Sequence, residues 1–354
     1  MNKLVLSKAF FVCTQNPGVN YYRSCLFANK MNAPFFPKES LTHLADWEII
    51  LEKNMDILYD IEKGVEKADV VVWQRLSTWR GFASWMGLKL KHKKKMLLEI
   101  DDNVFHVDSS NPGHMAIYPG SEAYEVFKKQ LQESDGVIVT TNNLKKYYKQ
   151  FNKHIWVIPN SLDFNVWNTA LKKKKAHKKV VIAWQGGTHH SLDLQLLNSV
   201  VPKVLKEFGD NVEFQFYGYM PDTLKIKGCT FVTPTGVDKY IENMVRINPD
   251  IIIAPLCDNY LNRGRSNLRV IEAGAMSVPV VVSAGKELPY QEVVSNSHGG
   301  YLAKNTADWV SALGILIKSP KLRKKLGVLL NGYVKKNYDV HDTVRKYKEI
   351  IASL

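Results

Sequence analysis

Short apolar segments alternate with longer amphipathic segments along most of the chain. Segments such as 70–73 and 280–283 are rich in β-branched residues and have the length of strands that are buried on both faces. Between them lie stretches with the helical spacing of apolar positions, for example 192–208. Strands that alternate regularly with helices form parallel sheets covered by helices. The pattern therefore predicts an α/β protein with doubly wound parallel sheets.

The alternation occurs twice, and a turn-rich and then lysine-rich segment separates the two halves. Residues 159–167 open with a Pro-Asn-Ser turn and residues 171–179 are largely lysine, which is a linker composition. We predict an amino-terminal domain over 1–168, a carboxyl-terminal domain over 169–335 and a final helix within 336–354. The predicted strands are 4–13, 70–73, 96–100, 136–140, 155–158, 180–184, 212–217, 230–232, 250–254 and 280–283. The predicted helices include 121–133, 143–150, 192–208, 238–247, 267–276 and 308–317.

The chain carries an excess of positive charge. Its 354 residues include 48 Lys and Arg against 34 Asp and Glu, which gives a formal net charge of +14. The excess is concentrated in residues 89–95, 172–179, 318–325 and 335–336. Clustered cations favour a polyanionic partner, either nucleic acid or an anionic membrane surface. The alternative is that the clusters are solvated loops that keep the protein soluble.

The apolar segments and the cysteines predict a cytoplasmic protein. No apolar segment has the length of a transmembrane helix. The amino-terminal segment is more like a first strand than a signal peptide, because Lys8 interrupts its apolar residues. The four cysteines, Cys13, Cys25, Cys229 and Cys257, are widely spaced in apolar surroundings, so we expect buried thiols.

Segment 262–283 combines cations with a strand–helix–strand pattern. Residues 250–254 and 280–283 predict two parallel strands, and 267–276 predicts the helix that connects them. Ligands bind at the carboxyl ends of such strands, and here that end carries the sequence Arg-Gly-Arg-Ser at 263–266. Free helix amides, the helix dipole and two guanidiniums together predict a diphosphate site.

Individual side chains can be assigned within this predicted site. Arg263, Arg265 and Ser266 are the candidates that bind the diphosphate. Arg265, Arg269 and Glu272 share one helix face because they are four and three residues apart. Glu272 is then placed to accept hydrogen bonds from ribose hydroxyls. The alternative interpretation is a solvated ion-pair face.

A second loop follows the predicted strand 180–184 and precedes a helix. Gly187 lets backbone amides approach a phosphate, and the hydroxyl of Thr188 can donate a further hydrogen bond. His189 or His190 can contact the same ligand. The alternatives are an ordinary turn and polar surface histidines.

Segment 262–282 resembles the donor-binding motif of retaining GT-B glycosyltransferases of the "glycosyl transferases group 1" family. That motif reads Asn, two residues, Lys/Arg-Ser, then Leu-Lys/Arg, Glu-Ala and Pro-Val-Val. Glu272 matches the second of two family glutamates, and Gly264 occupies the position of the first. Further matching motifs, in the family's order, are Gly-Val-Asn-Tyr-Tyr-Arg at 18–23, Asp-Asp-Asn-Val-Phe at 101–105, Ile-Pro-Asn-Ser-Leu-Asp at 158–163 and Ala-Trp-Gln-Gly-Gly-Thr-His-His at 183–190.

The resemblance implies a GT-B fold, in which two Rossmann-like domains with doubly wound parallel sheets are separated by an interdomain cleft. It implies transfer of a sugar from a nucleotide-diphosphate sugar, which we expect to be a UDP-sugar, to an acceptor hydroxyl with retention. In this design guanidiniums and helix termini neutralise the leaving diphosphate, so we expect no metal and no cofactor besides the co-substrate. Arg265 is then the catalytic cation, Tyr217 contacts the nucleobase and Gly18 approaches the sugar.

Residues of the first half are candidates for the acceptor side. Asp102 follows the predicted strand 96–100 and is the candidate that positions or deprotonates the acceptor hydroxyl. The alternative is that the two adjacent aspartates cap a loop. The candidate acceptor-binding residues, which combine cations, a carboxylate and an aromatic ring, are Arg23, Arg75, Trp79, Arg80 and Asp101.

Three hypotheses for the function follow. The first is a bacteriophage enzyme that glycosylates 5-hydroxymethylpyrimidines such as hydroxymethylcytosine in DNA, which is motivated by the charge of +14. The second is a peripheral bacterial glycosyltransferase for surface polysaccharide, glycolipid or protein. The third is a non-catalytic module that binds nucleic acid or a nucleotide sugar. Each is compatible with a monomer or a homodimer.

Overall fold

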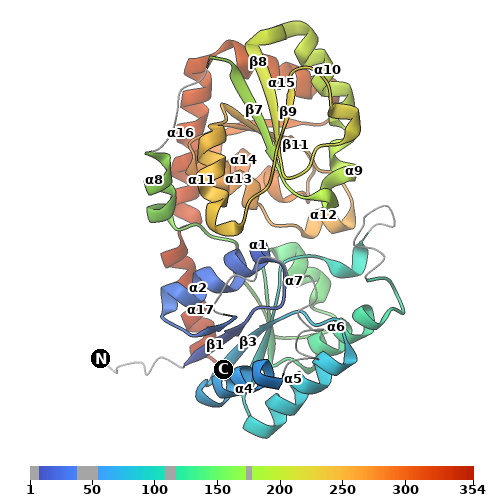
Figure 1. The fold of residues 1–354 in the computed structure, drawn as a ribbon, viewed down its shortest axis with the longest axis vertical. Coiled ribbons are helices and arrows are strands. Elements are labelled where there is room, and N and C mark those ends of the chain that lie inside the picture. Colours follow the sequence, from blue (N-terminus) through green and yellow to red (C-terminus); the bar gives the residue numbers. More distant parts are fainter. Residues whose placement is uncertain (1–7, 38–54, 108–116, 173–177) are drawn as a thin grey trace. The chain divides into compact units, whose positions relative to one another are not determined.

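The chain forms two compact units (Figure 1). Unit 1 contains the described residues up to Asn160 together with Val340–Leu354, and unit 2 contains the described residues of Ser161–Asp339. The computed structural model describes residues 8–37, 55–107, 117–172 and 178–354.

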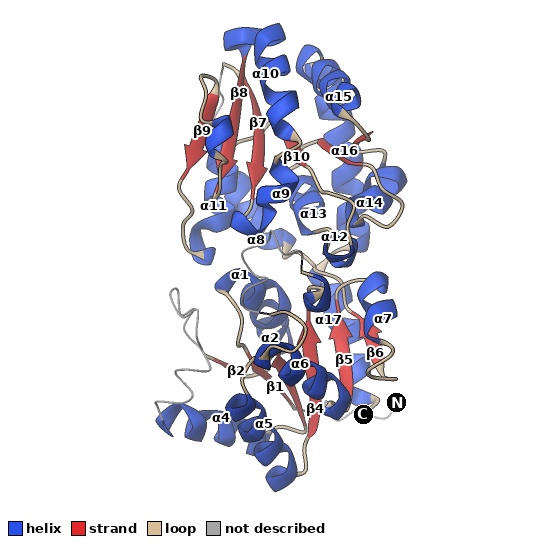
Figure 2. Cartoon of the chain, turned by 90° about the vertical axis from the view of Figure 1, so that its right-hand side faces the viewer, coloured by secondary structure: helices blue, strands red, loops and turns tan. Residues whose placement is uncertain are grey.

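Unit 1 is built on a six-stranded parallel sheet with the order β2-β1-β3-β4-β5-β6. The chain leaves β1 toward β2 and then returns to the other side of β1 at β3, with helices on both faces (Figure 2). The strands are β1 (Ala9–Val12), β2 (Phe35–Phe36), β3 (Val70–Gln74), β4 (Lys95–Ile100), β5 (Gly136–Val139) and β6 (Ile155–Val157). The helices are α1 (Pro17–Asn20), the π-helix Tyr21–Cys25, α2 (Leu26–Met31), α4 (Met55–Lys67), α5 (Trp79–His92), the 3-10 helix Val104–His106, α6 (Glu122–Glu133), α7 (Asn142–Tyr148) and α17 (Val340–Ala352).

Unit 2 contains a second six-stranded parallel sheet with the order β12-β11-β10-β7-β8-β9. Its switch point, where successive crossovers change direction, lies between β7 and β10. The strands are β7 (Val180–Gln185), β8 (Val212–Tyr217), β9 (Cys229–Val232), β10 (Ile251–Ala254), β11 (Val280–Ser283) and β12 (Gly300–Ala303). The helices are α8 (Phe164–Leu171), the 3-10 helix Thr188–His190, α9 (Ser191–Leu194), α10 (Leu197–Phe208), the 3-10 helices Gly209–Asn211 and Asp222–Leu224, α11 (Val237–Ile247), α12 (Tyr260–Gly264), α13 (Leu268–Ala275), α14 (Pro289–Ser297), α15 (Thr306–Lys318) and α16 (Pro320–Asn337).

Apolar residues on both faces of the sheets form the cores. Strands β3 and β10 are buried along their whole length, as expected for central strands of a doubly wound sheet. In unit 1 the largest buried side chains include Trp73, Trp85 and Phe127 on one face of the sheet and Phe11, Phe27 and Tyr347 on the other. The predicted doubly wound parallel sheets are therefore confirmed.

The last helix, α17, returns the chain to unit 1 and packs on α2. Its apolar positions Val344, Tyr347 and Ile351 are buried because they lie on one helix face. The ring of Tyr347 lies 5.6 Å from that of Phe11 and 5.3 Å from that of Phe27. Helix α17 thus completes the core beside β1. None of the helices within the described ranges is long and apolar enough to cross a membrane.

Two local predictions need correction. The predicted helix 192–208 is two helices, α9 and α10, with a break before Leu197. The predicted loop 263–266 begins inside α12, because the side chain of Asn259 accepts a hydrogen bond from the amide of Asn262 and caps a short extra helix. The first part of the predicted strand 4–13, residues 4–7, lies outside the described residues.

Candidate functional site

In unit 2 the loops that follow β7 and β10 flank the switch point of the sheet. Ligands of open α/β sheets bind at the carboxyl ends of the strands at such a point. The loop after β7 carries Gly187 and Thr188, which are both exposed. The chain after β10 leads through Cys257 into α12 and then to Arg265 and Ser266, which are both half-buried. The structure therefore brings these predicted donor residues to one edge of one sheet.

Two glycines allow the backbone to pack closely at this edge. Gly218 follows β8 with φ of +94°, and a methyl group there would lie 2.5 Å from the carbonyl oxygen of Gly186. A methyl group on Gly186 would in turn lie 2.4 Å from a terminal guanidinium nitrogen of Arg269. The Arg269 guanidinium also lies 5.1 Å from the centroid of the Trp184 ring. Arg269 thus reaches the loop after β7, and the predicted diphosphate-binding set omitted it.

Arg263, in the last turn of α12, and Arg265, which follows that helix, have different surroundings. Arg263 forms ion pairs with Asp258 at 2.7 Å and Glu287 at 3.4 Å. Arg265 donates from Nε to Oδ1 of Asn262 at 2.8 Å. Carboxylates compensate part of the charge of Arg263. Arg265 and Arg269 both lie close enough to His190 to act on it electrostatically, so we place this pair at the anion.

A buried hydrogen-bond network lies directly behind Arg265. The carboxyl of Asp193 accepts hydrogen bonds from His190 at 2.7 Å, from the amide of Cys257 at 2.9 Å and from the side chain of Asn262 at 2.7 Å. Burial, and then the positive charges of Arg269 and Arg265, hold the pKa of His190 well below its usual range. We therefore assign a neutral His190 that donates through Nδ1. The same two cations that depress this pKa create a positive potential suited to an anionic ligand.

Glu272 lies one turn beyond Arg269 and is buried in α13. Its Oε2 accepts a hydrogen bond from Tyr240 at 2.8 Å and lies 3.5 Å from the side-chain nitrogen of Gln185. Tyr217, at the end of β8, bonds through its hydroxyl to the amide of Thr235 at 3.0 Å. The structure thus places the predicted ribose and base residues at the same strand edge as Arg265.

In unit 1 a switch point lies between β1 and β3. Gln74, at the end of β3, accepts hydrogen bonds from the amides of Thr14 at 2.8 Å and Gln15 at 3.1 Å. The carbonyl of Arg75 accepts from the Thr14 hydroxyl at 2.9 Å. These bonds tie down the loop that leads to Gly18, which is half-buried at the start of α1.

Arg23 is completely buried, whereas a residue that binds the acceptor would be exposed to it. It has no exposed surface, its Nε is 2.6 Å from Oε1 of Glu99, and its NH1 donates to Asn160 at 3.0 Å. Burial raises the pKa of Glu99, and the adjacent Arg23 opposes that shift. The structure gives Arg23 the partners of a core ion pair, whereas the sequence predicted a cation facing a ligand.

The paired aspartates follow β4 in the same unit. The carbonyl of Asp102 accepts from the Tyr148 hydroxyl at 2.6 Å, and that of Asp101 from the Thr140 hydroxyl at 3.2 Å. Burial, and then the carboxyls of Asp102 and Glu99, raise the pKa of Asp101 to about 8. This shift favours the protonated form of Asp101, and Asp102 stays the predicted general base.

The aromatic and basic candidates beyond β3 differ in exposure. Trp79 is 46% exposed and Arg80 is exposed, both in the first turn of α5, while Arg75 is half-buried. The amide of Trp79 donates to Glu122 at 2.7 Å, which fixes the start of that helix. Trp79 and Arg80 are thus presented to solvent as a ring and a cation.

The comparisons with known proteins concern structure alone. No family model and no curated protein matches the chain. HepE from Anabaena, solved with UDP and glucose, is 12% identical and superimposes with a TM-score of 0.65 over 98% of this chain and 100% of HepE. A protein from Listeria monocytogenes assigned as a UDP-N-acetylglucosamine 2-epimerase is 12% identical, with a TM-score of 0.54 over 98% of this chain and 96% of that one.

The chain has the GT-B fold. TarM from S. aureus, solved with UDP and alpha-GlcNAc-glycerol, is also similar, with 17% identity and a TM-score of 0.59. The match covers 83% of this chain but only 58% of TarM, so this chain spans little more than half the length of TarM. At these identities the similarity establishes the GT-B fold.

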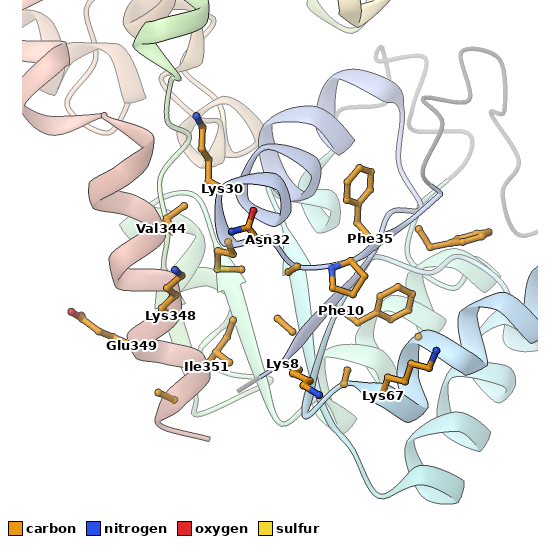
Figure 3. Close-up of a pocket in the computed structure, with 18 of the residues that line it drawn as sticks. Lys8, Phe10, Lys30, Asn32, Phe35, Lys67, Val344, Lys348, Glu349 and Ile351 are labelled. Carbon is orange, nitrogen blue, oxygen red and sulfur yellow. The ribbon is translucent and has the colours of Figure 1, made fainter. Parts of the chain in front are cut away.

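A cavity of about 1680 Å³ opens in unit 1 of this GT-B chain, and none of the candidate site residues lines it (Figure 3). It is lined by Lys8 and Phe10 at the start of β1, by Lys67 at the end of α4 and by Lys348 and Ile351 of α17. The candidate residues instead follow the carboxyl ends of the strands. Within unit 1 the cavity therefore lies toward the amino-terminal end of β1, whereas Gly18 follows its carboxyl-terminal end.

Proposed function

We propose that the protein is a glycosyltransferase that uses a nucleotide-diphosphate sugar as donor. The observation that carries this proposal is the group of two cations and a carboxylate at the switch point of unit 2. Arg265, at the end of α12, and Arg269, in α13, supply positive charge, and the buried Glu272 lies one turn beyond Arg269 in α13. This is the order of charges that a diphosphate followed by a ribose requires.

The proposed roles follow from these positions. The diphosphate binds Arg265, Arg269 and the backbone amides of the exposed residues Gly187 and Thr188, with Arg263 and Ser266 at the margin of the site. Glu272 binds the ribose and Tyr217 lies toward the base. When the bond between the sugar and the diphosphate breaks, negative charge develops on the leaving oxygen. Preorganised guanidiniums stabilise that charge most strongly in the transition state.

Unit 1 supplies the acceptor side of the proposed reaction. Asp102 positions or deprotonates the acceptor hydroxyl, and Gly18 lies in the tethered loop after β1. Retention of the anomeric configuration is part of the proposal, as is the absence of a metal, because the two guanidiniums already offset the charge of the diphosphate. The GT-B fold by itself does not decide the chemistry: the Listeria monocytogenes neighbour is assigned as an epimerase.

We further propose 5-hydroxymethylpyrimidine in DNA as the acceptor. The net charge of +14 supports a polyanionic acceptor. Trp79 and Arg80 add an exposed ring and cation of the kind that binds nucleic acid. Part of the lysine cluster 89–95 is compensated, since Lys91 pairs with Glu62 at 2.7 Å and Lys89 with Asp135 at 3.1 Å.

Mass spectrometry of digested DNA tests this acceptor. Duplexes containing hydroxymethylcytosine or hydroxymethyluracil are incubated with the protein and a panel of nucleotide sugars, then reduced to nucleosides. We expect a new nucleoside heavier by one sugar residue and DNA binding that weakens steeply with salt. Donor hydrolysis without a mass gain would reject DNA as the acceptor. Epimerised donor would indicate the epimerase chemistry, and no donor turnover would indicate a non-catalytic module.

Helix α16 favours a second candidate, a peripheral glycosyltransferase with a glycolipid or surface-glycan acceptor. The helix contains six Lys and Arg and no Asp or Glu. Val328 is 57% exposed and Leu329 is 41% exposed, between Lys324 and Lys325 on one side and Lys335 and Lys336 on the other. An exposed apolar pair flanked by lysines suits an anionic lipid surface.

Vesicle sedimentation distinguishes this candidate from the first. With vesicles of phosphatidylcholine and phosphatidylserine, we expect the double charge reversal Lys324→Glu and Lys325→Glu to weaken binding at least about tenfold, at roughly 1 kcal/mol per cation. The matched control reverses Lys203 and Lys206, which are exposed on α10. Equal loss in both variants would mean that only net charge matters, and no binding by the wild type would reject the membrane surface.

A further inference from the structure

We propose that Asp193 is a positioning residue for Arg265, and thereby for the diphosphate of the donor; this rests on the proposed function. Neither residue needs to contact the other directly. Asp193 lies in α9 and accepts a hydrogen bond from the side chain of Asn262 in α12. Asn262 in turn accepts a hydrogen bond from Arg265.

Two hydrogen bonds connect Asp193 to Arg265 through Asn262, and we call this connection the relay. Each of its bonds has a defined donor and acceptor. The side-chain nitrogen of Asn262 donates to Oδ1 of Asp193 at 2.7 Å and to the carbonyl of Cys257 at 2.9 Å. These two bonds fix which way the amide of Asn262 faces. Its Oδ1 is therefore directed to Nε of Arg265, at 2.8 Å. A reversed amide would present a donor to a donor, so the orientation set by Asp193 decides whether Arg265 is held.

Asp193 also joins the loops on both sides of the switch point. It accepts hydrogen bonds from His190, which follows β7, and from the amide of Cys257, which follows β10. Both Asp193 and Asn262 are buried, with 3% and 2% exposed surface. A carboxyl in such a place costs free energy unless it is hydrogen-bonded, and here it gathers three donors from two loops. The same geometry that satisfies the carboxyl sets the distance between the loop of Gly187 and the loop of Arg265.

A buried network of this kind has a structural role as well, so the test must separate stability from positioning. The probe is UDP, with ADP and GDP beside it, and the readout is the dissociation constant measured by calorimetry. We expect Arg265→Ala to weaken nucleoside-diphosphate binding at least about tenfold, the effect of losing one charge-assisted bond. Asp193→Ala should weaken it by a similar factor. The double variant should bind the nucleoside diphosphate no more weakly than Arg265→Ala alone, because Asp193 acts through Arg265.

Two further variants control this cycle. Asp193→Asn keeps an oxygen that accepts from Asn262, and we expect its dissociation constant to stay within about threefold of the wild type. Asp250→Ala removes a carboxyl that accepts from the amide of Val181 at 3.0 Å and pairs with Arg323 at 3.4 Å, at the other end of the sheet. It should lower the melting temperature and leave nucleotide binding unchanged.

The outcomes separate the two proposals. If the wild type binds none of the three nucleotides, the proposed donor class is wrong. If the wild type binds a nucleotide but the effects of Asp193→Ala and Arg265→Ala are additive, the relay is overturned. A loss of binding in Asp250→Ala as large as in Asp193→Ala would likewise overturn it, because general destabilisation would then explain both.

Discussion

Arg265→Ala should abolish measurable sugar transfer and leave the fold intact. Arg265 carries the charge that the departing diphosphate needs, and removing one such preorganised group costs about 10²–10³-fold in kcat. The structural loss is small by comparison, because the side chain is half-buried and its hydrogen bond to Asn262 is worth about 1 kcal/mol. The measurement is kcat for donor turnover, together with the thermal unfolding curve of the variant.

Two variants make this result interpretable. Arg265→Lys keeps the charge but loses the planar fork and the Nε bond to Asn262, so we expect partial activity. Arg246→Ala removes an exposed arginine of α11 and should leave turnover unchanged. Near-normal turnover by Arg265→Ala would reject its proposed role. Equal losses in Arg265→Ala and Arg246→Ala would show that the effect comes from net charge.

The sheets were predictable from sequence because their central strands are continuous apolar segments. Strands β8 and β11 have the predicted bounds, 212–217 and 280–283. The strand β2, only two residues long, and β12 were not predicted. Neither strand contains a run of buried residues, since none is buried in β2 and only Ala303 is buried in β12, so the apolar pattern there is weak. Local capping also escaped prediction: the Asn259 cap that creates α12 depends on backbone geometry as well as on residue type.

The candidate site was predictable to the extent that its residues are close in sequence. Arg265 and Glu272 lie on one short segment, and helical spacing places Arg269 beside Glu272 in α13. The predicted helix face shared by all three is wrong for Arg265, which precedes α13 with extended backbone. The proximity of Arg269 to Gly186, which is 83 residues away in the sequence, could not be predicted from local residue spacing. Asp193 was missed for the same reason, since its partner Asn262 is 69 residues away. The pattern His-x-x-Asp at 190–193, directly after the Gly-Gly loop, was the signal that could have identified Asp193.

Arg23 shows how a motif residue can have a structural role that its motif does not reveal. Its partner Glu99 is 76 residues away and comes from β4. An arginine in a sequence that resembles a binding motif suggests a ligand contact. The fold instead buries the guanidinium completely and surrounds it with Glu99, Asn160 and the ring of Phe27 at 5.8 Å. Burial depends on the whole of unit 1, so a local pattern cannot report it.

Arg23→Ala should therefore destabilise unit 1 strongly. Removing one partner of a buried ion pair leaves an uncompensated charge and costs about 3–5 kcal/mol. The double variant Arg23→Met with Glu99→Leu removes both charges and keeps the volume, so we expect it to recover most of that loss. Urea unfolding of the wild type, the single variant and the double variant measures the three free energies. A single variant within about 0.5 kcal/mol of the wild type, the usual range for surface positions, would contradict the buried pair.

The pH dependence of this variant gives an independent check. In the wild type, burial raises the pKa of Glu99 above its ordinary value while Arg23 lowers it. Without Arg23 the pKa of Glu99 in the folded state rises further, so the folded protein holds a proton that the unfolded chain releases. The stability of Arg23→Ala should then fall as the pH rises through that pKa, and its deficit relative to the wild type should be larger at pH 8 than at pH 5. A deficit that does not change with pH would indicate lost packing against Phe27 in place of an uncompensated carboxylate.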